Sequence, residues 1–312
     1  MKTAIITTVF NEGSNVTRFL RSILEQRTLP DDLVIVDGGS TDDTYMQIAR
    51  FAPDFAARGV RFHALQEHCN IAEGRNRAIA STEAGIICVT DAGVTVDHGW
   101  FEEISRPLIG DPDVDYVGGN FQIGGENGVQ RALRVVGFKN KQTNNPSSRS
   151  FAFRRSCWQA FPYPENLKVH EDTKLCNEWR ARGFRFAHAP AACVEWLAED
   201  TLPKLYRKFA RYTEWTVRSG DRIDALRKLQ ISTYVFAILL LPWAPLAALA
   251  VVVAAVVLRL ARQYRRAFGG IGGATGLRLL PWAVAVQLTL DAATLSGCLR
   301  GAWRRLFKGP AR

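Results

Sequence analysis

The sequence predicts an α/β fold with a doubly wound, mainly parallel sheet, followed by C-terminal transmembrane or interfacial helices. Over roughly the first ninety residues, short apolar runs alternate with helix-like segments, which is typical of parallel strands joined by crossover helices. Beyond residue 230, long apolar stretches are flanked by basic side chains. That combination is typical of a segment at or within a bilayer.

Four strands are predicted for this sheet. They cover residues 4–9, 33–36, 60–65 and 86–90, with helices reaching to about residue 26, to about residue 51 and over 72–81. Right-handed crossovers place the loops that follow parallel strands at one edge of the sheet. Asn11, Glu12, Asp37 and Asp91 end or follow such strands, so we expect them at that edge. Open α/β sheets bind their ligands there.

The second strand ends in a distinctive turn, in which Asp37 is followed by two glycines and then by Ser40 and Thr41. Two glycines permit a tight turn and the close approach of a ligand to the backbone. Ser40 or Thr41 is expected to cap the helix that follows. A capped strand-to-helix turn accounts for the hydroxyl residues. It does not account for an acid at the strand end beside two glycines.

After Asp91 the pattern becomes less regular. We expect helices at 98–109 and 171–182, a helical turn at 155–160, and short strands at 116–119, 150–154, 184–187 and 192–196. Most of the stretch 120–150 is polar and rich in Gly and Asn, and no element is predicted between residues 120 and 149.

Three domains are predicted: residues 1–200 form the α/β domain, 201–230 an amphipathic interfacial segment, and 231–312 membrane-anchoring helices with a basic loop and tail. In the middle segment, apolar and basic residues recur at helical spacing. They are Leu205, Phe209, Tyr212 and Trp215, with Lys204, Arg207, Lys208 and Arg211 between them. Such a helix can lie in the headgroup plane of a membrane. It can equally pack on the α/β domain, and both interpretations stay open.

The run from Ile231 to Leu258 carries no charge and is long enough to span a bilayer. Pro242 and Pro245 interrupt it, so a kinked single helix and a helical hairpin both fit. A second candidate, 279–299, contains Asp291, and an acid inside such a segment usually faces protein or water. Two single crossings would put the Arg-rich loop between them outside, against the positive-inside rule. We therefore favour a hairpin or a longer pair of helices.

The positive charge of the chain is concentrated in its C-terminal part. Residues 201–312 hold 18 Lys and Arg against 4 Asp and Glu, whereas residues 1–200 hold 22 against 26. No zinc-finger, RNA-recognition or basic-zipper pattern accompanies this excess, so we predict no nucleic-acid partner. Six cysteines are scattered singly, which indicates reduced core residues in a cytosolic setting. We expect no signal peptide ahead of the first strand.

Several common site motifs are absent from the sequence. There is no GxxxxGK[ST], no GxGxxG after the first strand and no GxSxG, which argues against a P-loop nucleotidase, a dinucleotide-binding oxidoreductase and an α/β-hydrolase. The motifs present, in chain order, are TTVFNE, VDGGSTDDT, GRNRAI, VTDAG and HEDT. In this order and at these spacings, residues 1–200 resemble the family 2 glycosyltransferases of the GT-A fold.

The resemblance implies a binding site for a nucleotide-diphosphate sugar. Its members are Thr8, Val9, Asn11, Glu12, Asp37, Arg75 and Asp91. In the family, the residues that Thr8 and Val9 match line the base, and the acid that Asp37 matches hydrogen-bonds it. Arg75 matches a basic residue near the nucleotide, and a guanidinium is a good partner for a diphosphate.

The resemblance also implies a divalent metal ion, Mg²⁺ or Mn²⁺, on the donor diphosphate. Asp91 opens the place of the family's DxD motif, but here the triplet is Asp91-Ala92-Gly93 and lacks the second carboxylate. Such ions prefer oxygen ligands and can keep several waters. Asp91 together with the donor phosphates is therefore one arrangement that could hold a metal, and metal dependence stays open.

Glu171 and Asp172 match the family's ED motif, in which the Asp is the general base of an inverting transfer. Asp172 would take the proton of the acceptor hydroxyl as its oxygen attacks the anomeric carbon. Ser148 and Arg149 stand where acceptor-facing residues lie in the family. The segment from Lys208 to Tyr212 is a degenerate form of the QxxRW motif of processive synthases, which does not support processive synthesis.

The sequence thus predicts an inverting glycosyltransferase that faces the cytoplasm from the inner (plasma) membrane, anchored as a multi-pass or hairpin protein. It would move a sugar from a nucleotide-diphosphate donor to a membrane-proximal glycan acceptor, which we expect to be lipid-linked, in glycan or polysaccharide assembly. Two alternatives stay open. One is a polyprenyl-phosphate sugar synthase of the same fold, and the other is a non-catalytic membrane-bound binder of nucleotide sugars.

Overall fold

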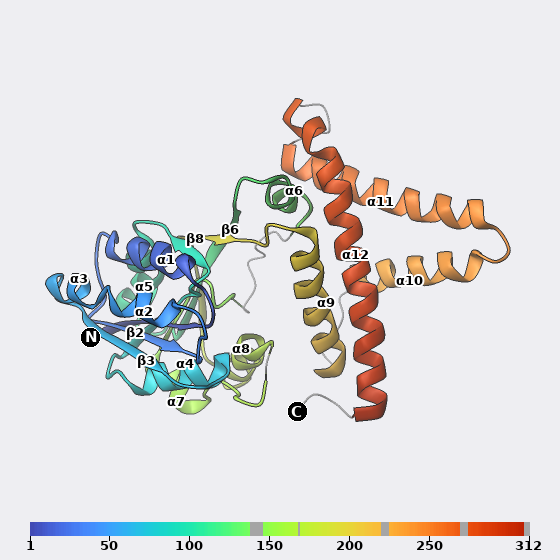
Figure 1. The fold of residues 1–312 in the computed structure, drawn as a ribbon. Coiled ribbons are helices and arrows are strands. Elements are labelled where there is room, and N and C mark those ends of the chain that lie inside the picture. The colour runs from blue at the N-terminus through green and yellow to red at the C-terminus, as the bar shows by residue number, and fades with distance from the viewer. Residues whose placement is uncertain (138–145, 168, 220–224, 269–273, 309–312) are drawn as a thin grey trace. The chain divides into compact units, whose positions relative to one another are not determined.

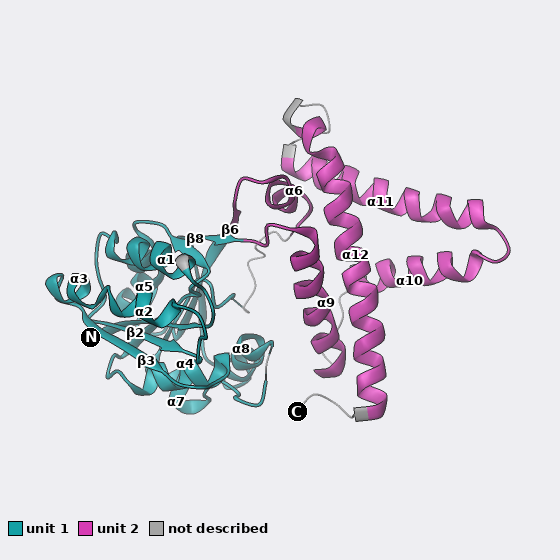
Figure 2. Ribbon diagram, in the orientation of Figure 1, with its two compact units in different colours: residues 1–122, 140–197 teal, residues 123–139, 198–312 magenta. Residues whose placement is uncertain are grey.

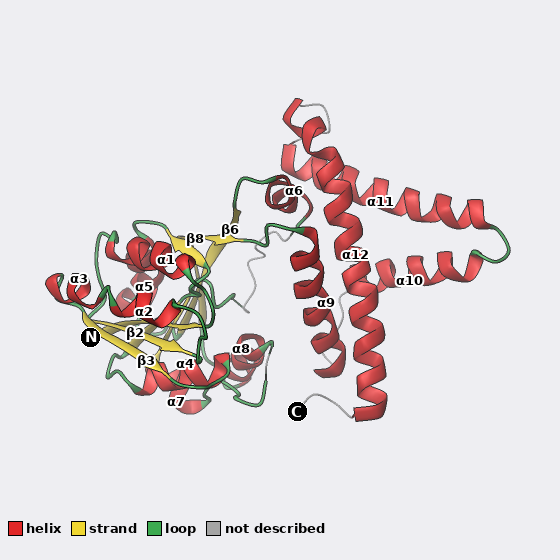
Figure 3. Ribbon diagram, in the orientation of Figure 1, coloured by secondary structure: helices red, strands yellow, loops and turns green. Residues whose placement is uncertain are grey.

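The computed structural model describes residues 1–137, 146–167, 169–219, 225–268 and 274–308, so parts of the predicted 120–150 stretch, basic loop and tail lie outside the described residues. Eight strands form one sheet in the order β3-β2-β1-β4-β7-β6-β8-β5. The strands are β1 (Thr3–Val9), β2 (Asp32–Asp37), β3 (Arg61–Gln66), β4 (Ile86–Val89), β5 (Val94–Val96), β6 (Tyr116–Gly124), β7 (Phe151–Arg154) and β8 (Phe186–Leu197). The predicted α/β class is confirmed (Figure 3).

Helices connect these strands and make up most of the described C-terminal part (Figure 1). The first group is α1 (Ser14–Leu24), α2 (Thr44–Ala49), α3 (Ala52–Ala57), α4 (Ile71–Ala80), α5 (Trp100–Gly110), α6 (Gly128–Val136), α7 (Arg155–Ala160) and α8 (Glu171–Ala181). The second group is α9 (Leu202–Ser219), α10 (Ala225–Leu240), α11 (Pro245–Phe268) and α12 (Ala274–Lys308). The predicted C-terminal apolar helices are therefore present.

The parallel half of the sheet is the half that the sequence predicts best. β1 pairs in parallel with β2 and with β4, and β2 pairs in parallel with β3. β1, β2 and β4 are almost wholly buried, as expected for strands covered on both faces. The other half is antiparallel, with β7 between β4 and β6 and with β5 paired to β8. The loops after β1, β2 and β4 meet at one edge.

Several local expectations were wrong. Neither Ser40 nor Thr41 caps α2, which begins at Thr44 with no side-chain cap. The two short strands expected at 184–187 and 192–196 are one strand, β8. The strand expected at 116–119 continues to Gly124 as β6, and β5 and α6 were not predicted.

Two compact units make up the chain (Figure 2). The first comprises residues 1–122 and 140–197, and the second comprises 123–139 and 198–312. Helix α6 belongs to the second unit, where Gln130 Nε2 donates to the carbonyl oxygen of Ala198 over 2.8 Å and Asn127 Nδ2 donates to that of Asp200 over 2.8 Å. The predicted domain limits at residues 200 and 230 stay a prediction.

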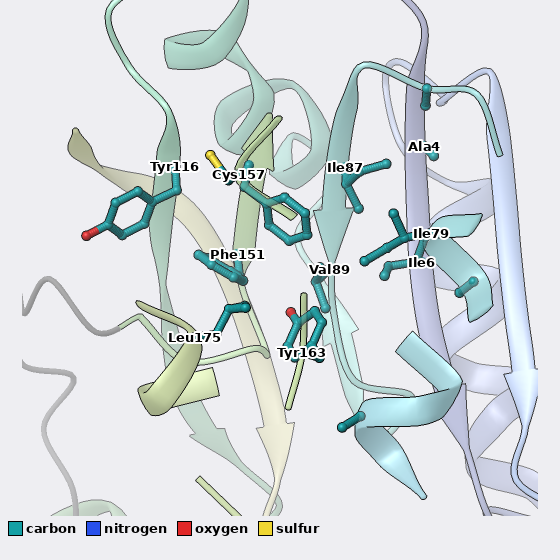
Figure 4. Packing of buried hydrophobic residues seen from close by; sticks show 14 of the residues in the cluster. Ala4, Ile6, Ile79, Ile87, Val89, Tyr116, Phe151, Cys157, Tyr163 and Leu175 are labelled. Atoms are coloured by element: carbon teal, nitrogen blue, oxygen red, sulfur yellow. The ribbon is translucent and has the colours of Figure 1, made fainter. Parts of the chain in front are cut away.

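An aromatic cluster in the first unit anchors α8 against the sheet (Figure 4). The ring centroid of Trp179 on α8 lies 4.9 Å from that of Phe153 and 5.9 Å from that of Phe151, both on β7. Leu175 and Cys176 on the same helix are also fully buried. Because these side chains fix the body of α8, its N-terminal residues Glu171 and Asp172 are held in place.

Two helices of the second unit, over Pro245–Ala267 and Gly276–Phe307, are long and apolar enough to cross a membrane. α10 and α11 run side by side as a hairpin that extends away from α12 (Figure 1).

Candidate active site

The loops after β1 and β2 are joined by hydrogen bonds through Asn11. Its backbone N–H donates to Ser40 Oγ over 2.8 Å, and its Oδ1 accepts from the backbone N–H of Thr41 over 2.9 Å. Asn11 has a φ of 52°, in the left-handed region that Asn tolerates better than most residues. Next to it, the Glu12 N–H donates to Thr44 Oγ1 over 2.9 Å. Asn11 and Glu12 thus shape the edge at which we expected them.

Asp37 is fully buried at the end of β2 and holds the loop that follows it. Its Oδ1 accepts from the backbone N–H of Ser40 over 2.9 Å and from Ser40 Oγ over 2.6 Å. Its Oδ2 accepts from Gln66 Nε2 over 2.9 Å. An ionised carboxylate has about four acceptor positions, and these three bonds leave about one. Recognition of a nucleobase by Asp37 stays a prediction.

Next to this loop, β1 packs against α4. Val9 is buried and Thr8 is half-buried. A Cβ added at Gly74 would lie 2.7 Å from Cγ2 of Thr8, so only glycine lets α4 pack this close to β1. This close packing brings the next residue of α4, Arg75, within reach of Asp91 at the end of β4.

Arg75 is buried and joins two acids from distant parts of the chain. Its Nη2 donates to Asp91 Oδ1 over 2.9 Å, and its Nη1 donates to Glu171 Oε1 over 2.7 Å. The Tyr163 ring centroid lies 5.3 Å from the guanidinium carbon. The structure therefore brings Arg75, Asp91 and Glu171 together. With both ends of the guanidinium engaged by carboxylates, Arg75 positions these acids, and a contact with a diphosphate stays a prediction.

The charges in this cluster shift one another's pKa values. Burial acts to lower the pKa of Arg75, but Tyr163, Glu171 and Asp91 around it raise that pKa above its ordinary value. Arg75 therefore stays protonated. Burial, reinforced by the negative charge of Asp172, raises the pKa of Glu171, although Arg75 opposes the shift. Glu171 thus holds a proton up to a higher pH than an exposed glutamate would.

Asp172 is half-buried at the start of α8, with its two oxygens in different surroundings. Oδ1 accepts from the backbone N–H of Thr173 over 2.7 Å, which fixes the carboxylate. Oδ2 accepts from Ser148 Oγ over 3.2 Å. A hydroxyl can thus approach Oδ2 in the geometry that proton transfer to a base requires. The structure places the predicted base Asp172 and the predicted acceptor residue Ser148 in contact.

Arg149 packs against two neighbouring aromatic rings that sequence reasoning missed. Its guanidinium carbon is 4.3 Å from the ring centroid of Trp196 on β8 and 5.1 Å from that of Phe121 on β6. Its carbonyl oxygen accepts from Thr90 Oγ1 over 2.8 Å, which ties it to the end of β4. No local signal marks Phe121 or Trp196, because they reach Arg149 only through the pairing of distant strands.

Asp91 is the one predicted metal ligand. Among the described residues, no three His, Cys, Asp or Glu side chains gather closely enough to hold a metal ion. The Asp91 side chain is 35% exposed at the end of β4, with one oxygen bound to Arg75. A single carboxylate together with substrate phosphates can bind Mg²⁺ or a similar hard cation. The residues present are thus compatible with a divalent ion that the donor helps to hold.

An α/β sheet with acids gathered at the edge where its parallel strands end is the arrangement that the resemblance to GT-A glycosyltransferases predicted. The sequence model of glycosyl transferase family 2 matches residues 4–172, and the chain belongs to this family. This is the family that the resemblance predicted.

Curated relatives and solved structures agree with this family. Poly-β-1,6-N-acetyl-D-glucosamine synthase of Staphylococcus aureus is 22% identical over 219 residues, 66% of this chain and 52% of the relative. Teichoic acid poly(glycerol phosphate) polymerase of Staphylococcus epidermidis is 34% identical over 91 residues, 29% of this chain and 12% of the relative. The chain therefore spans about half the length, or less, of these curated relatives.

Two solved structures share the fold. The mannosyltransferase PcManGT from Pyrobaculum calidifontis, in complex with GDP-Man and Mn²⁺, aligns with a TM-score of 0.58 at 17% identity, over 97% of this chain and 88% of that chain. TarS from S. aureus aligns with a TM-score of 0.50 at 15% identity, over 95% of this chain and 55% of that chain.

Proposed function

We propose that the protein transfers a sugar from a nucleotide-diphosphate donor to a hydroxyl of a membrane-associated, lipid-linked glycan, with inversion at the anomeric carbon. The observation that carries this proposal is the contact between Asp172 Oδ2 and Ser148 Oγ at 3.2 Å. In this contact a hydroxyl group meets one oxygen of the carboxylate, while the other oxygen is fixed by the Thr173 N–H. An acceptor hydroxyl in that position would meet its general base directly.

The donor half of the proposed site is the edge formed by the loops after β1, β2 and β4. Its residues are Thr8, Val9, Asn11, Glu12, Asp37, Arg75 and Asp91. The first five line or shape the nucleotide end, and Asp91 faces the diphosphate. A divalent ion bound there would neutralise charge on the leaving diphosphate. Arg75 keeps Asp91 and Glu171 in place through its two hydrogen bonds.

In the proposed reaction, the acceptor oxygen forms a bond to the anomeric carbon as the bond from that carbon to the diphosphate oxygen breaks. The electron pair of the broken bond leaves with the nucleoside diphosphate. Asp172 takes the proton of the acceptor hydroxyl. Ser148 lies against the base, and the next residue, Arg149, packs its guanidinium against Phe121 and Trp196.

We assign residues 1–200 to catalysis, 201–230 to an interfacial segment and 231–312 to the membrane anchor. The support is the two helices long and apolar enough to cross a membrane, together with the basic excess after residue 200. A polysaccharide synthase and a teichoic acid polymerase among the relatives agree with an acceptor at a membrane. A catalytic domain on the cytoplasmic face of the inner membrane would have access to cytoplasmic nucleotide sugars.

The test incubates membranes that contain the full chain with labelled nucleotide sugars, with and without Mn²⁺, and analyses the lipid-extractable products. We expect a labelled glycolipid from wild type and a loss of about 10²–10⁴-fold with Asp172→Asn, the usual range for removal of a general base. Glu178→Gln, a change on the same helix at an acid that pairs with Lys174, is the matched control and should keep its activity.

The products also separate the alternatives. A lipid monophosphosugar as the only product would identify a polyprenyl-phosphate sugar synthase. Donor binding with no turnover on any lipid acceptor would identify a non-catalytic binder, which the missing second carboxylate at Asp91-Ala92-Gly93 suggests. Unchanged activity of Asp172→Asn would remove Asp172 from its proposed role.

A further inference from the structure

We infer that α10 and α11 form a re-entrant hairpin that enters the hydrocarbon core of a lipid bilayer and returns to the same side without crossing it, while α12 lies at the membrane surface. The partner of this hairpin is the hydrocarbon core of the bilayer. The inference deepens the membrane association in the proposed function and does not depend on the catalytic assignments.

The two ends of the charge-free run Ile231–Leu258 meet at one buried acid, Asp291 on α12. Gln230, the residue before the run, donates from Nε2 to Asp291 Oδ1. Arg259, the residue after it, donates from Nη1 to Oδ1 over 3.0 Å and from Nη2 to Oδ2 over 2.7 Å. The chain thus leaves and re-enters the same polar cluster, which forms the base of the hairpin.

Other polar groups complete this base. Tyr234 Oη donates to Asp291 Oδ2, and Gln287 Nε2 donates to Oδ1 over 2.8 Å. Gln263 Nε2 donates to Gln287 Oε1 over 3.1 Å. Because charged and amide groups are costly to place in hydrocarbon, this cluster marks the depth at which the hydrocarbon begins.

The legs of the hairpin are too short for a full crossing. From the base to the turn, residues 231–241 reach about 16 Å and residues 245–258 about 21 Å at roughly 1.5 Å per residue. The hydrocarbon core of a bilayer is about 30 Å thick. Each leg therefore passes beyond the middle of the hydrocarbon by a few ångströms at most, and the turn between them stays within it.

The surface of the hairpin matches this placement. Large apolar side chains are exposed along both legs and at the turn, where Trp243 is 88% and Leu246 82% exposed. The others are Val235, Phe236, Ile238, Leu239, Leu241, Leu249, Val253, Val257 and Leu258. Basic side chains lie at the other end of both legs: Lys228 on α10, and Arg262, Arg265 and Arg266 on α11. Anionic lipid headgroups attract basic side chains placed in this way.

α12 cannot cross the bilayer without taking α9 with it. A Cβ added at Gly297 would lie 2.6 Å from the carbonyl oxygen of Ala210, so the two helices pack at close range. Tyr206 Oη donates to Ser296 Oγ over 2.8 Å, and Arg304 pairs with Glu214 at 2.7 Å. These contacts extend along much of α9. Its basic residues Lys204, Arg207, Lys208, Arg211 and Arg218 would then enter hydrocarbon, which is unfavourable.

The experiment measures labelling of single added cysteines by a membrane-impermeant maleimide, in sealed vesicles of each orientation. The added cysteines are Trp243→Cys at the turn, Ala267→Cys at the end of α11, Ala302→Cys near the end of α12 and Asp54→Cys in the first unit. Wild type, whose six cysteines are buried or half-buried, supplies the background. Should Trp243→Cys not accumulate, Leu241→Cys takes its place.

We expect the cysteines at 54, 267 and 302 to react from the same side, and the one at 243 to react from neither side until detergent is added. Labelling of residue 267 from the side opposite to 54 and 302 would establish two separate crossings and overturn the inference. Labelling of residue 243 from the opposite side would establish a fully crossing hairpin and also overturn it. Recovery of the protein only in the soluble fraction would instead contradict the proposed membrane association.

Discussion

Arg75 and Glu171 are 96 residues apart in sequence, yet Arg75 Nη1 lies 2.7 Å from Glu171 Oε1. Both side chains are buried, and the second donor group of Arg75 reaches Asp91. This pair links α4 to the N-terminus of α8 and, through Asp91, to the end of β4. The residue next to Glu171 is the proposed base, so the position of Asp172 depends on a cation from the parallel half of the sheet.

Removal of the Arg75 charge should destabilise the protein strongly. In Arg75→Met, Glu171 and Asp91 would lose their shared cation, and breaking a buried pair typically costs about 3–5 kcal/mol. Urea unfolding measures the change. Arg77→Met is the matched control on the same helix, because Arg77 pairs with Glu67 at an exposed site and should change stability by less than about 1 kcal/mol. Equal effects of the two changes would contradict the linking role of Arg75.

The raised pKa of Glu171 should appear in the pH dependence of stability. Because the folded state binds this proton more tightly than the unfolded state, the stabilisation it gives is complete below the ordinary pKa of 4.5 and is lost as the pH rises through the folded pKa. Glu171→Gln, which cannot ionise, lacks this loss. Relative to wild type, the variant should become more stable as the pH rises from 4.5.

Urea unfolding of both proteins at a series of pH values gives this difference directly. Subtracting the free energy of unfolding of wild type from that of the variant removes the contributions of all titrating groups that the substitution does not affect. A difference that stays constant with pH, or moves in favour of wild type as the pH rises, would show that the attraction of Arg75 outweighs burial at Glu171.

The sequence predicted those parts of the fold that depend on local pattern. β1, β2 and β4 are short apolar runs bounded by turns, and such runs are buried wherever the sheet forms. α6 was missed although Asn127 and Gln130 form a capping box, a signal that local reasoning could have used. β5 has three residues and pairs with β8 about a hundred residues later, so nothing local marks it.

The same limit applies to the site. The acids at the strand ends were predicted because the geometry of parallel sheets alone places them at one edge. Their partners were not. Arg75 binds Glu171, and Arg149 packs against Trp196 and Phe121, only because of strand pairing and helix packing across the whole first unit.

Substitution of Ser148 should change the kinetic constants for the acceptor more than those for the donor. In Ser148→Ala, the hydrogen bond to Asp172 Oδ2 is lost, and a single hydrogen bond of about 1 kcal/mol corresponds to roughly a fivefold change. We expect kcat/KM for the acceptor to change by about that factor, with KM for the donor unaltered. Steady-state kinetics with each substrate varied in turn measures both. A change confined to the donor KM would place Ser148 outside the acceptor site.

Ser40 should matter for the donor because it joins the two nucleotide loops. Its hydroxyl donates to Asp37 Oδ1 over 2.6 Å and accepts from the Asn11 N–H over 2.8 Å. Ser40→Ala removes both hydrogen bonds. At about 1 kcal/mol each, the loss of stabilising free energy would reach roughly 2 kcal/mol. Since the loops are the proposed nucleotide end of the site, part of this loss should appear as weaker binding of the nucleoside diphosphate.

Isothermal titration with nucleoside diphosphates, alongside urea unfolding, separates the two effects in Ser40→Ala. Thr41→Ala is the matched control, because its hydroxyl lies 3.5 Å from Asn11 Oδ1 while its backbone N–H, which makes the shorter bond of 2.9 Å, is retained. We expect Thr41→Ala to bind the nucleotide nearly as wild type does. If Ser40→Ala also binds normally while unfolding more easily, the Asp37–Ser40–Asn11 connection stabilises the loops without forming part of the nucleotide site.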